Sequence, residues 1–232
     1  MRSRSTILVL LCALVIVLAF IWVRHRSAPA AQQDGEAAGV TIDKRPVNFV
    51  TRTFDPNDPP SDMPPMTPGE EAVCDTNFIS NVNVGGQDSK TDDTHEIVTI
   101  TQIAVTLQLN VTIWVPTGAT QHVIDHENGH REISEYYYQS ADKVAERIAA
   151  TYMGKRDLVH GADLNAAFNT WLQQEGADIT DEYDAGLNPS PAQERYDEIT
   201  DHSRNDVVAK DAVAQALKEA AVGSAVPAPE GN

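Results

Sequence analysis

A chain of 232 residues is long enough for one sizeable domain together with an anchor and a tail. Its formal net charge of −17 at pH 7 argues against nucleic acid as a partner, because proteins that bind nucleic acid need a basic surface. Only two cysteines are present, and Cys12 lies in a membrane-type segment while Cys74 lies outside it. We therefore expect no internal disulfide and no cysteine-rich metal site.

Residues 1–26 combine a long apolar run with arginines on both sides. The run from Ile7 to Val23 is short for a transmembrane helix, but longer than the usual apolar core of a cleaved signal peptide. We predict an uncleaved signal anchor that crosses the cytoplasmic membrane once and leaves the acidic domain on the periplasmic or extracellular side. Secretion after signal cleavage is the alternative, because Ala28-Pro29-Ala30 resembles a cleavage site.

The domain is predicted to cover residues 41–221, between a flexible stalk over residues 27–40 and a disordered tail over residues 222–232. Asp55 to Gly69 contains six prolines, and it is expected to be an irregular loop because proline removes backbone donors and restricts the residue before it.

Two segments of the first half carry β signals. Val40 to Phe54 alternates well enough to predict a first strand. Glu96 to Val115 is stronger, because every second residue from Ile103 to Val115 is apolar, which predicts one buried and one polar face. This run is long for a single strand, so we expect a bend or hairpin near Thr101 or Ala104.

The second half is predicted to be helical. Thr117 or Thr120 can cap a helix that runs to about Met153. Further helices are expected over Asp163–Gln174, over Ser190–His202 with Ser190 as cap and Gln193 reaching back to it, and over Asp206–Ala221. Residues 175–188 are expected to be irregular. The fold class is therefore α+β, with a β-rich N-terminal half packed on a long helix and on C-terminal helices.

The long helix contains His126-Glu127-Asn128-Gly129-His130, an H-E-x-x-H motif. Residues four apart share one face of a helix, so His126 and His130 can direct two imidazole nitrogens to one metal ion, Zn²⁺ by the motif's usual preference. Glu127 could then act as general base for a water molecule that the metal acidifies. Gly129 is costly within a helix, and it predicts the close approach of a neighbouring element.

A catalytic zinc usually has three protein ligands, so the motif requires one more. The candidates are His122, His160, His202, Glu194 and Glu198. His202 is distinguished by the preceding residues, Tyr196-Asp197-Glu198-Ile199-Thr200-Asp201. Tyr196 could donate a hydrogen bond to an oxyanion. Asp197 or Asp201 could accept a hydrogen bond from a ligand imidazole and fix its tautomer.

These two motifs resemble a family of bacterial secreted or membrane-anchored proteins that are predicted zinc-dependent proteases. That family combines a β-rich first half, a strand ending in proline, an H-E-x-x-H helix and a late Y-D-x-x-T-x-H segment, here Tyr196 to His202. The resemblance implies a zincin-like fold, with His126, His130 and His202 as zinc ligands and Glu127 as the base. The family pattern continues with glycine after the late histidine, where this chain has Ser203.

The expected function is that of a membrane-anchored zinc endopeptidase, in which Glu127 activates the attacking water and Tyr196 stabilises the oxyanion. The expected partners are a protein or peptide substrate, which the polar side of the Ile103–Val115 strand could align if it is an edge strand, and the membrane. Two alternatives remain open: a zinc hydrolase that cleaves cell-wall peptide amides, and an exported metal-binding or interaction domain without catalysis.

Overall fold

The computed structural model describes residues 39–66 and 69–223. The predicted signal anchor, almost all of the predicted stalk and most of the predicted tail lie outside these residues. Among the described helices, none is long and apolar enough to cross a membrane.

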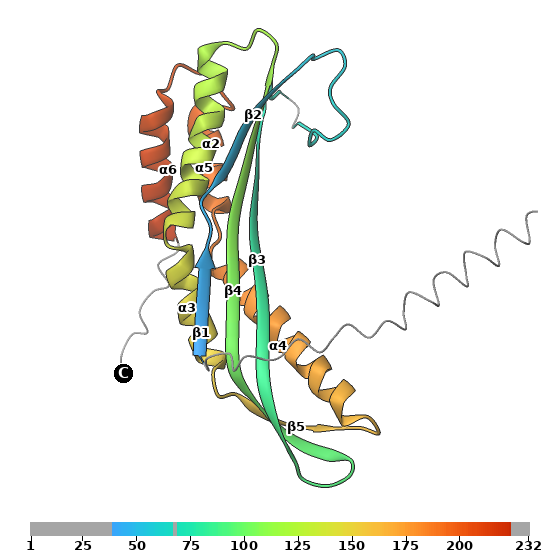
Figure 1. Cartoon of the computed structure of the whole chain (residues 1–232). Helices are drawn as coiled ribbons and strands as arrows, with labels where there is room; N and C mark the ends of the chain where they lie inside the picture. The colour runs from blue at the N-terminus through green and yellow to red at the C-terminus, as the bar shows by residue number, and fades with distance from the viewer. Residues whose placement is uncertain (1–38, 67–68, 224–232) are drawn as a thin grey trace, which may run out of the picture. The chain divides into compact units, whose positions relative to one another are not determined.

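One long strand, β4 (His95–Pro116), organises a five-stranded sheet (Figure 1). Along one edge it pairs antiparallel with β3 (Val73–Lys90) over almost its whole length. Along the other edge it pairs in turn with β5 (Arg156–His160), which is antiparallel, and with β1 (Gly39–Lys44) and β2 (Asn48–Phe54), which are parallel. β4 is therefore the central strand, and among the described strands β3 forms one edge of the sheet.

The predicted irregularity near Thr101 is a β-bulge rather than a hairpin. Gly85 of β3 pairs with Gln102 and Gly86 pairs with Ile100, so Thr101 has no opposite residue in β3. The extra residue changes which positions point into the core, because burial alternates on even-numbered residues up to Ile100 and on odd-numbered residues from Ile103. β4 therefore remains one strand, and the bulge at Thr101 shifts by one residue which side chains point into the core.

Other strand predictions need correction. The predicted strand from Val40 to Phe54 is two strands, β1 and β2, interrupted at residues 45–47, where Pro46 cannot donate to the sheet. β3 and β5 were not predicted at all. The outward side of β3 carries asparagines and an aspartate, and its inward side is only partly buried, so the apolar alternation that marks a strand is weak there.

Within residues 39–66 and 69–223, five helices follow or flank the sheet: α2 (Gln121–Gln139), α3 (Ala141–Tyr152), α4 (Leu164–Gly186), α5 (Ser190–Thr200) and α6 (Ala209–Gly223). The predicted long helix is two helices, α2 and α3, separated at Ser140. Of the two expected caps, Thr117 and Thr120, it is the Thr120 side chain that caps α2. The segment predicted to be irregular after residue 174 continues α4 as helix, and the helix predicted to reach His202 ends at Thr200.

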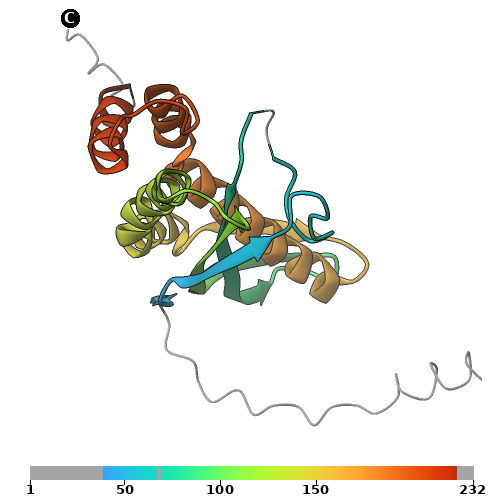
Figure 2. The same ribbon diagram turned by 90° about the horizontal axis from the view of Figure 1, so that it is seen from above.

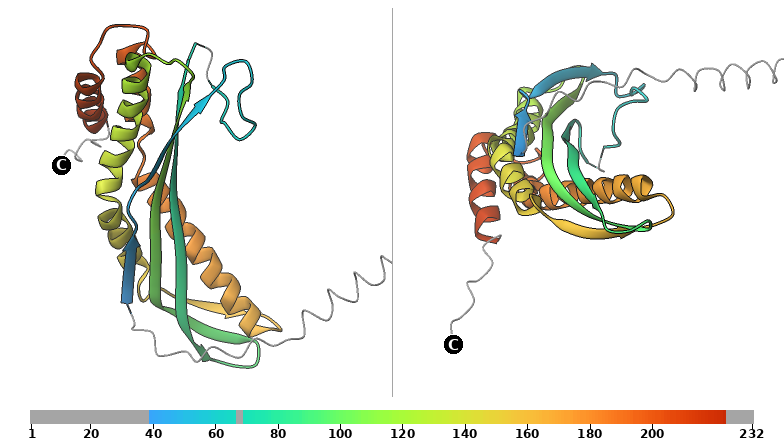
Figure 3. Two further views of the ribbon diagram at one scale, coloured as in Figure 1. Left: turned by 45° about the horizontal axis from the view of Figure 1, so that its top comes forward. Right: turned by 60° about the horizontal axis from the view of Figure 1, so that its bottom comes forward.

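The helices pack on the inward face of the sheet and on each other. α3 and α4 contact the strands, and α4 crosses β3 (Figure 3). Their main cluster joins Ile103, Leu107 and Leu109 of β4 to Tyr138 and Ile179, all almost fully buried. A second cluster holds α5 and α6 against α2, where the three helices lie together (Figure 2). Because α5 packs on α2, two segments far apart in sequence meet at the H-E-x-x-H motif.

Candidate metal centre

His126 and His130 lie on one face of α2, with the second histidine one helical turn after the first. Their Nε2 atoms are 3.2 Å apart, and the His126 side chain is almost fully buried. Two ligand nitrogens on a tetrahedral zinc, each at its usual bond length, lie about 3.3 Å apart. The spacing of the two nitrogens therefore matches that of two ligands to one ion.

Asp197 of α5 completes a triangle with these two nitrogens. Its Oδ1 atom is 3.0 Å from Nε2 of His130 and 3.5 Å from Nε2 of His126. His126, His130 and Asp197 are a group whose ligand atoms all lie within 4.8 Å of one another. Oδ1 of Asp197 is buried without a well-aligned hydrogen bond, which a cation among the three residues would remedy. The residues present thus fit a divalent metal ion that prefers nitrogen and oxygen ligands.

The three residues of the triangle are at least partly buried, and contacts among them shift the pKa of each. Burial lowers the pKa of His126. Burial also works to lower the pKa of His130, but Asp197, Glu127 and Gln193 together outweigh it, and the pKa of His130 is raised. Burial works to raise the pKa of Asp197, yet its contacts with the two histidines hold that pKa well below its usual range. Asp197 is therefore ionised and can offer a negative oxygen to a cation at neutral pH.

Glu127 borders the same space from α2. Its side chain is 4% exposed, and desolvation raises its pKa to about 7, a shift that the charge on His130 opposes. The backbone of Cys74 at the start of β3 also works to lower the pKa of Glu127. A hollow of about 200 Å³ lies beside the triangle. It is lined by Glu127, the three residues of the triangle, Pro65, Glu70, Ala72, Val73 and Cys74. Glu127 thus faces the space where a small ligand of the metal would lie.

Gln193 holds His130 from behind. Its side-chain oxygen lies 2.6 Å from Nδ1 of His130, and its amide nitrogen donates to the backbone oxygen of His130 and to the Ser134 hydroxyl. An oxygen acceptor at Nδ1 places the ring proton there, which leaves Nε2 free to bind a metal. This role of Gln193 is not predictable from the sequence, where its position three residues after Ser190 indicates a helix cap. In the structure Pro189 is the N-cap and no side chain makes the cap hydrogen bond.

Tyr196 packs against the motif and is fully buried. Its ring stacks on His126 and meets His130 edge-on, and its hydroxyl donates to the backbone oxygen of His126. The expected close approach at Gly129 is confirmed, because a Cβ atom there would collide with the Tyr196 hydroxyl. This position corrects the predicted oxyanion role: the hydroxyl faces the backbone of α2, and Tyr196 instead keeps the two histidines in place.

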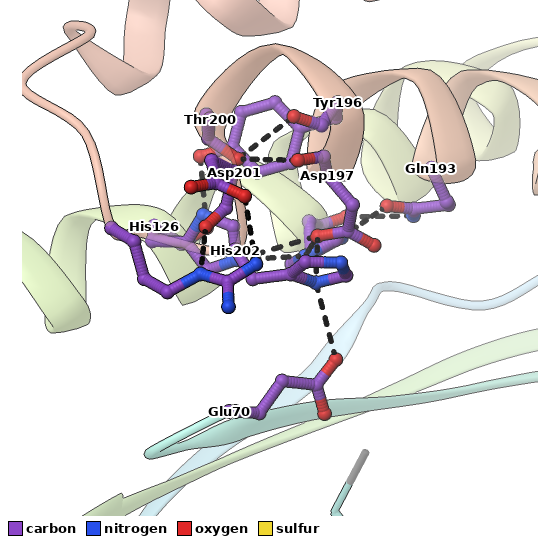
Figure 4. Close-up of polar contacts among 10 residues, drawn as sticks. Glu70, His126, Gln193, Tyr196, Asp197, Thr200, Asp201 and His202 are labelled. Atoms are coloured by element: carbon purple, nitrogen blue, oxygen red, sulfur yellow. Dashed lines mark hydrogen bonds and ion pairs between the residues drawn. The ribbon is translucent and has the colours of Figure 1, made fainter. Parts of the chain in front are cut away.

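His202 lies beside the triangle without joining it. Its Nδ1 atom is 3.6 Å from Oδ1 of Asp197 and 3.6 Å from Oε1 of Glu70, which approaches from the side away from α5 (Figure 4). Asp201, His202 and Ser203 all have positive φ angles. Serine adopts this left-handed backbone less easily than glycine does, so the backbone after α5 is strained at Ser203. His202 as third ligand stays a prediction.

The structure does not bring the other predicted candidates to the centre. His122 is exposed at the start of α2, and His160 is exposed on β5, opposite His95. Glu194 and Glu198 are exposed on α5, and Glu198 pairs with Arg195. No family model matches this chain, and neither a curated protein nor a solved structure matches it significantly.

Proposed function

We propose that this chain is a zinc-dependent peptidase, held at the outer side of the cytoplasmic membrane by its predicted anchor. The observation that carries the proposal is the triangle of His126 Nε2, His130 Nε2 and Asp197 Oδ1 beside the buried carboxyl group of Glu127. A mere surface cluster of polar residues would not require burial of both a histidine and a glutamate.

The three residues of the triangle would hold the metal, and Glu127 would handle the proton. A zinc ion there would acidify a water molecule and polarise the peptide carbonyl. Glu127 has a pKa near 7 without metal, so its carboxylate is matched to accepting a proton from that water near neutral pH. The same carboxyl would pass the proton to the leaving amine.

We assign Asp197 as the third ligand in the observed arrangement, because its Oδ1 atom lies about as far from the two histidine nitrogens as two ligand atoms of one metal ion lie from each other. His202 would then hydrogen-bond to Asp197 or complete the coordination after a small movement. The three-histidine site that the family resemblance implies is the competing assignment, and single substitutions at Asp197 and His202 distinguish the two.

The substrate would approach along β3 and not along β4. The polar side of β4 was expected to align the substrate if β4 were an edge strand, but β4 has partners on both edges. β3 starts at the candidate centre and pairs only with β4 among the described strands. The backbone N–H and C=O groups on the edge of β3 away from β4 could therefore pair with an extended peptide.

The proposal is tested by zinc content and zinc affinity of the full-length chain, measured by elemental analysis and competition with a chromophoric chelator. One zinc per chain, lost in both His126→Ala and His130→Ala, is the expected result. The exposed His122→Ala is the matched control and should keep its zinc. A chain that binds no zinc, or that binds it equally well in all four proteins, would contradict the proposal.

A further inference from the structure

Three hollows follow one another along β3. The first is the candidate centre, which includes Val73 and Cys74. The second, of about 190 Å³, is lined by Phe78, and the third, of about 500 Å³, is lined by Val82 to Val84. A strand rises about 3.3 Å per residue, so the hollows are spaced roughly 13 Å apart along the strand.

Each hollow is also bordered by residues of α4, of α5 or of the segment between them, and their residue numbers decrease as those of β3 increase. Asp197 of α5 borders the first hollow, Leu187 to Pro189 border the second, and α4 residues from Asn169 to Asp181 border the third. β3 is therefore the common wall of all three hollows, with α2 and Asp197 of α5 opposite it at the first hollow, and α4 with the residues that follow it opposite it at the other two. We call the three hollows, in their order from the candidate centre, the path along β3.

The charges along the path have one sign. Apart from the two histidines of the centre, every charged residue that lines a hollow is acidic: Glu70, Glu127, Asp181, Asp184 and Asp197. Asp181 and Asp184 are one turn apart on α4, and among the described residues neither forms an ion pair. Burial and the neighbouring Asp181 raise the pKa of Asp184, so a cation placed here would relieve a repulsion.

We propose that the path along β3 binds an extended, positively charged segment of a polypeptide substrate, with lysine or arginine side chains directed to Asp184 and Asp181. The proposal deepens the proposed function, and it rests on that function because the segment is identified as substrate. An extended chain covers about 3.3 Å per residue, so roughly ten residues are needed to reach from the centre to the third hollow. The substrate class is therefore an unfolded cationic segment rather than a dipeptide or a folded surface.

The probes are fluorescent peptides of four and of twelve residues, built from Gly, Ser and Thr. The longer peptide carries either three lysines or three glutamates at intervals of four residues, which repeats the spacing of the hollows. Binding is measured by fluorescence anisotropy at low salt, with the full-length, zinc-loaded Glu127→Gln protein so that no cleavage occurs. We expect the lysine twelve-mer to bind at least about tenfold more tightly than the glutamate twelve-mer and the four-mer.

Substitutions on α4 locate this preference. Asp181→Asn and Asp184→Asn should each weaken binding of the lysine twelve-mer about two- to fivefold, the value of an exposed ion pair. Asp75→Asn is the matched control, because Asp75 is an exposed carboxylate of β3 that points to the other face of the sheet. It removes the same charge and should leave binding unchanged. Equal affinity for both twelve-mers, or an equal loss in all three variants, would overturn the proposal.

The outcome also separates this inference from the proposed function. Peptide hydrolysis without any preference for lysine would support the peptidase and overturn the cationic path. Tight binding of the lysine twelve-mer that is weakened in both α4 variants and unchanged in Asp75→Asn would support the path. If the zinc-loaded wild-type chain then hydrolysed no bound peptide, the peptidase function would be overturned, and with it the identity of the segment as substrate.

Discussion

The side-chain oxygen of Gln193 lies 2.6 Å from Nδ1 of His130, although the two residues are 63 positions apart in the sequence. This contact ties α5 to the metal-binding face of α2 and sets the tautomer of a candidate ligand. We expect Gln193→Leu, which keeps the side-chain volume approximately, to weaken zinc binding about 10- to 100-fold. Zinc competition with a chelator measures the loss.

Gln193→Glu is the informative companion, because a carboxylate can still accept the Nδ1 proton of His130. It should keep most of the zinc affinity even though it loses the donor to Ser134. Identical losses in the leucine and glutamate variants would show that the acceptor oxygen at Nδ1 of His130 is not what Gln193 contributes to zinc binding.

The third ligand can be assigned by two single substitutions. Because Oδ1 of Asp197 lies within 3.5 Å of both histidine nitrogens, Asp197→Ala should weaken zinc binding at least about 100-fold. His202 lies beside that oxygen, so His202→Ala should cost no more than about tenfold. A larger loss of zinc affinity in His202→Ala than in Asp197→Ala would establish a three-histidine site, with Asp197 as a hydrogen-bond acceptor of a ligand histidine.

Gly129 is predicted to tolerate no side chain. A Cβ atom there would overlap the ring and hydroxyl of Tyr196, which packs on both motif histidines. Gly129→Ala should therefore destabilise the fold by about 1–3 kcal/mol, although alanine is the better helix former. Urea unfolding of the metal-free protein measures the change. Stabilisation by this substitution would show that Tyr196 is not fixed where the structure places it.

The raised pKa of Glu127 makes the metal-free protein sensitive to pH. The group titrates near 4.5 when unfolded and near 7 when folded, so between these values the folded state binds more protons. Stability should therefore fall as the pH rises from 4.5 to 7, by up to about 3 kcal/mol from this group. Glu127→Gln should remove that part of the slope, as measured by urea unfolding of chelator-treated protein at several pH values. An unchanged slope would show that Glu127 is solvated.

How much of this site the sequence could predict depends on how local each contact is. The pairing of His126 with His130 follows from helix periodicity alone, and the need for Gly129 follows from the cost of glycine in a helix. The central place of Asp197 and the contact of Gln193 arise from the packing of α5 on α2, which no local pattern specifies. For the same reason Tyr196 was expected to face a substrate and instead faces the backbone of His126.

The fold shows a similar division. Alternation in β4 was strong enough to predict the strand, and the length of the run indicated an irregularity near Thr101 or Ala104, of which the structure has the first. Thr120 was one of two expected helix caps, and it is the one that caps α2. β3 has too little apolar alternation to be recognised, because one side is exposed and the other is covered only in part. The acidic residues of α4 after residue 174 suggested a loop, but buried Ile179 and Tyr183 keep that segment helical.

The most direct test of the account is peptide hydrolysis by the zinc-loaded full-length chain, followed by mass spectrometry of a mixed peptide library, in parallel with Glu127→Gln of equal zinc content. If Glu127 moves the proton, wild type should cleave internal peptide bonds, and the variant should lose at least about 100-fold in rate while its zinc stays bound. Equal cleavage by both proteins, or no cleavage by either at full zinc occupancy, would contradict the account.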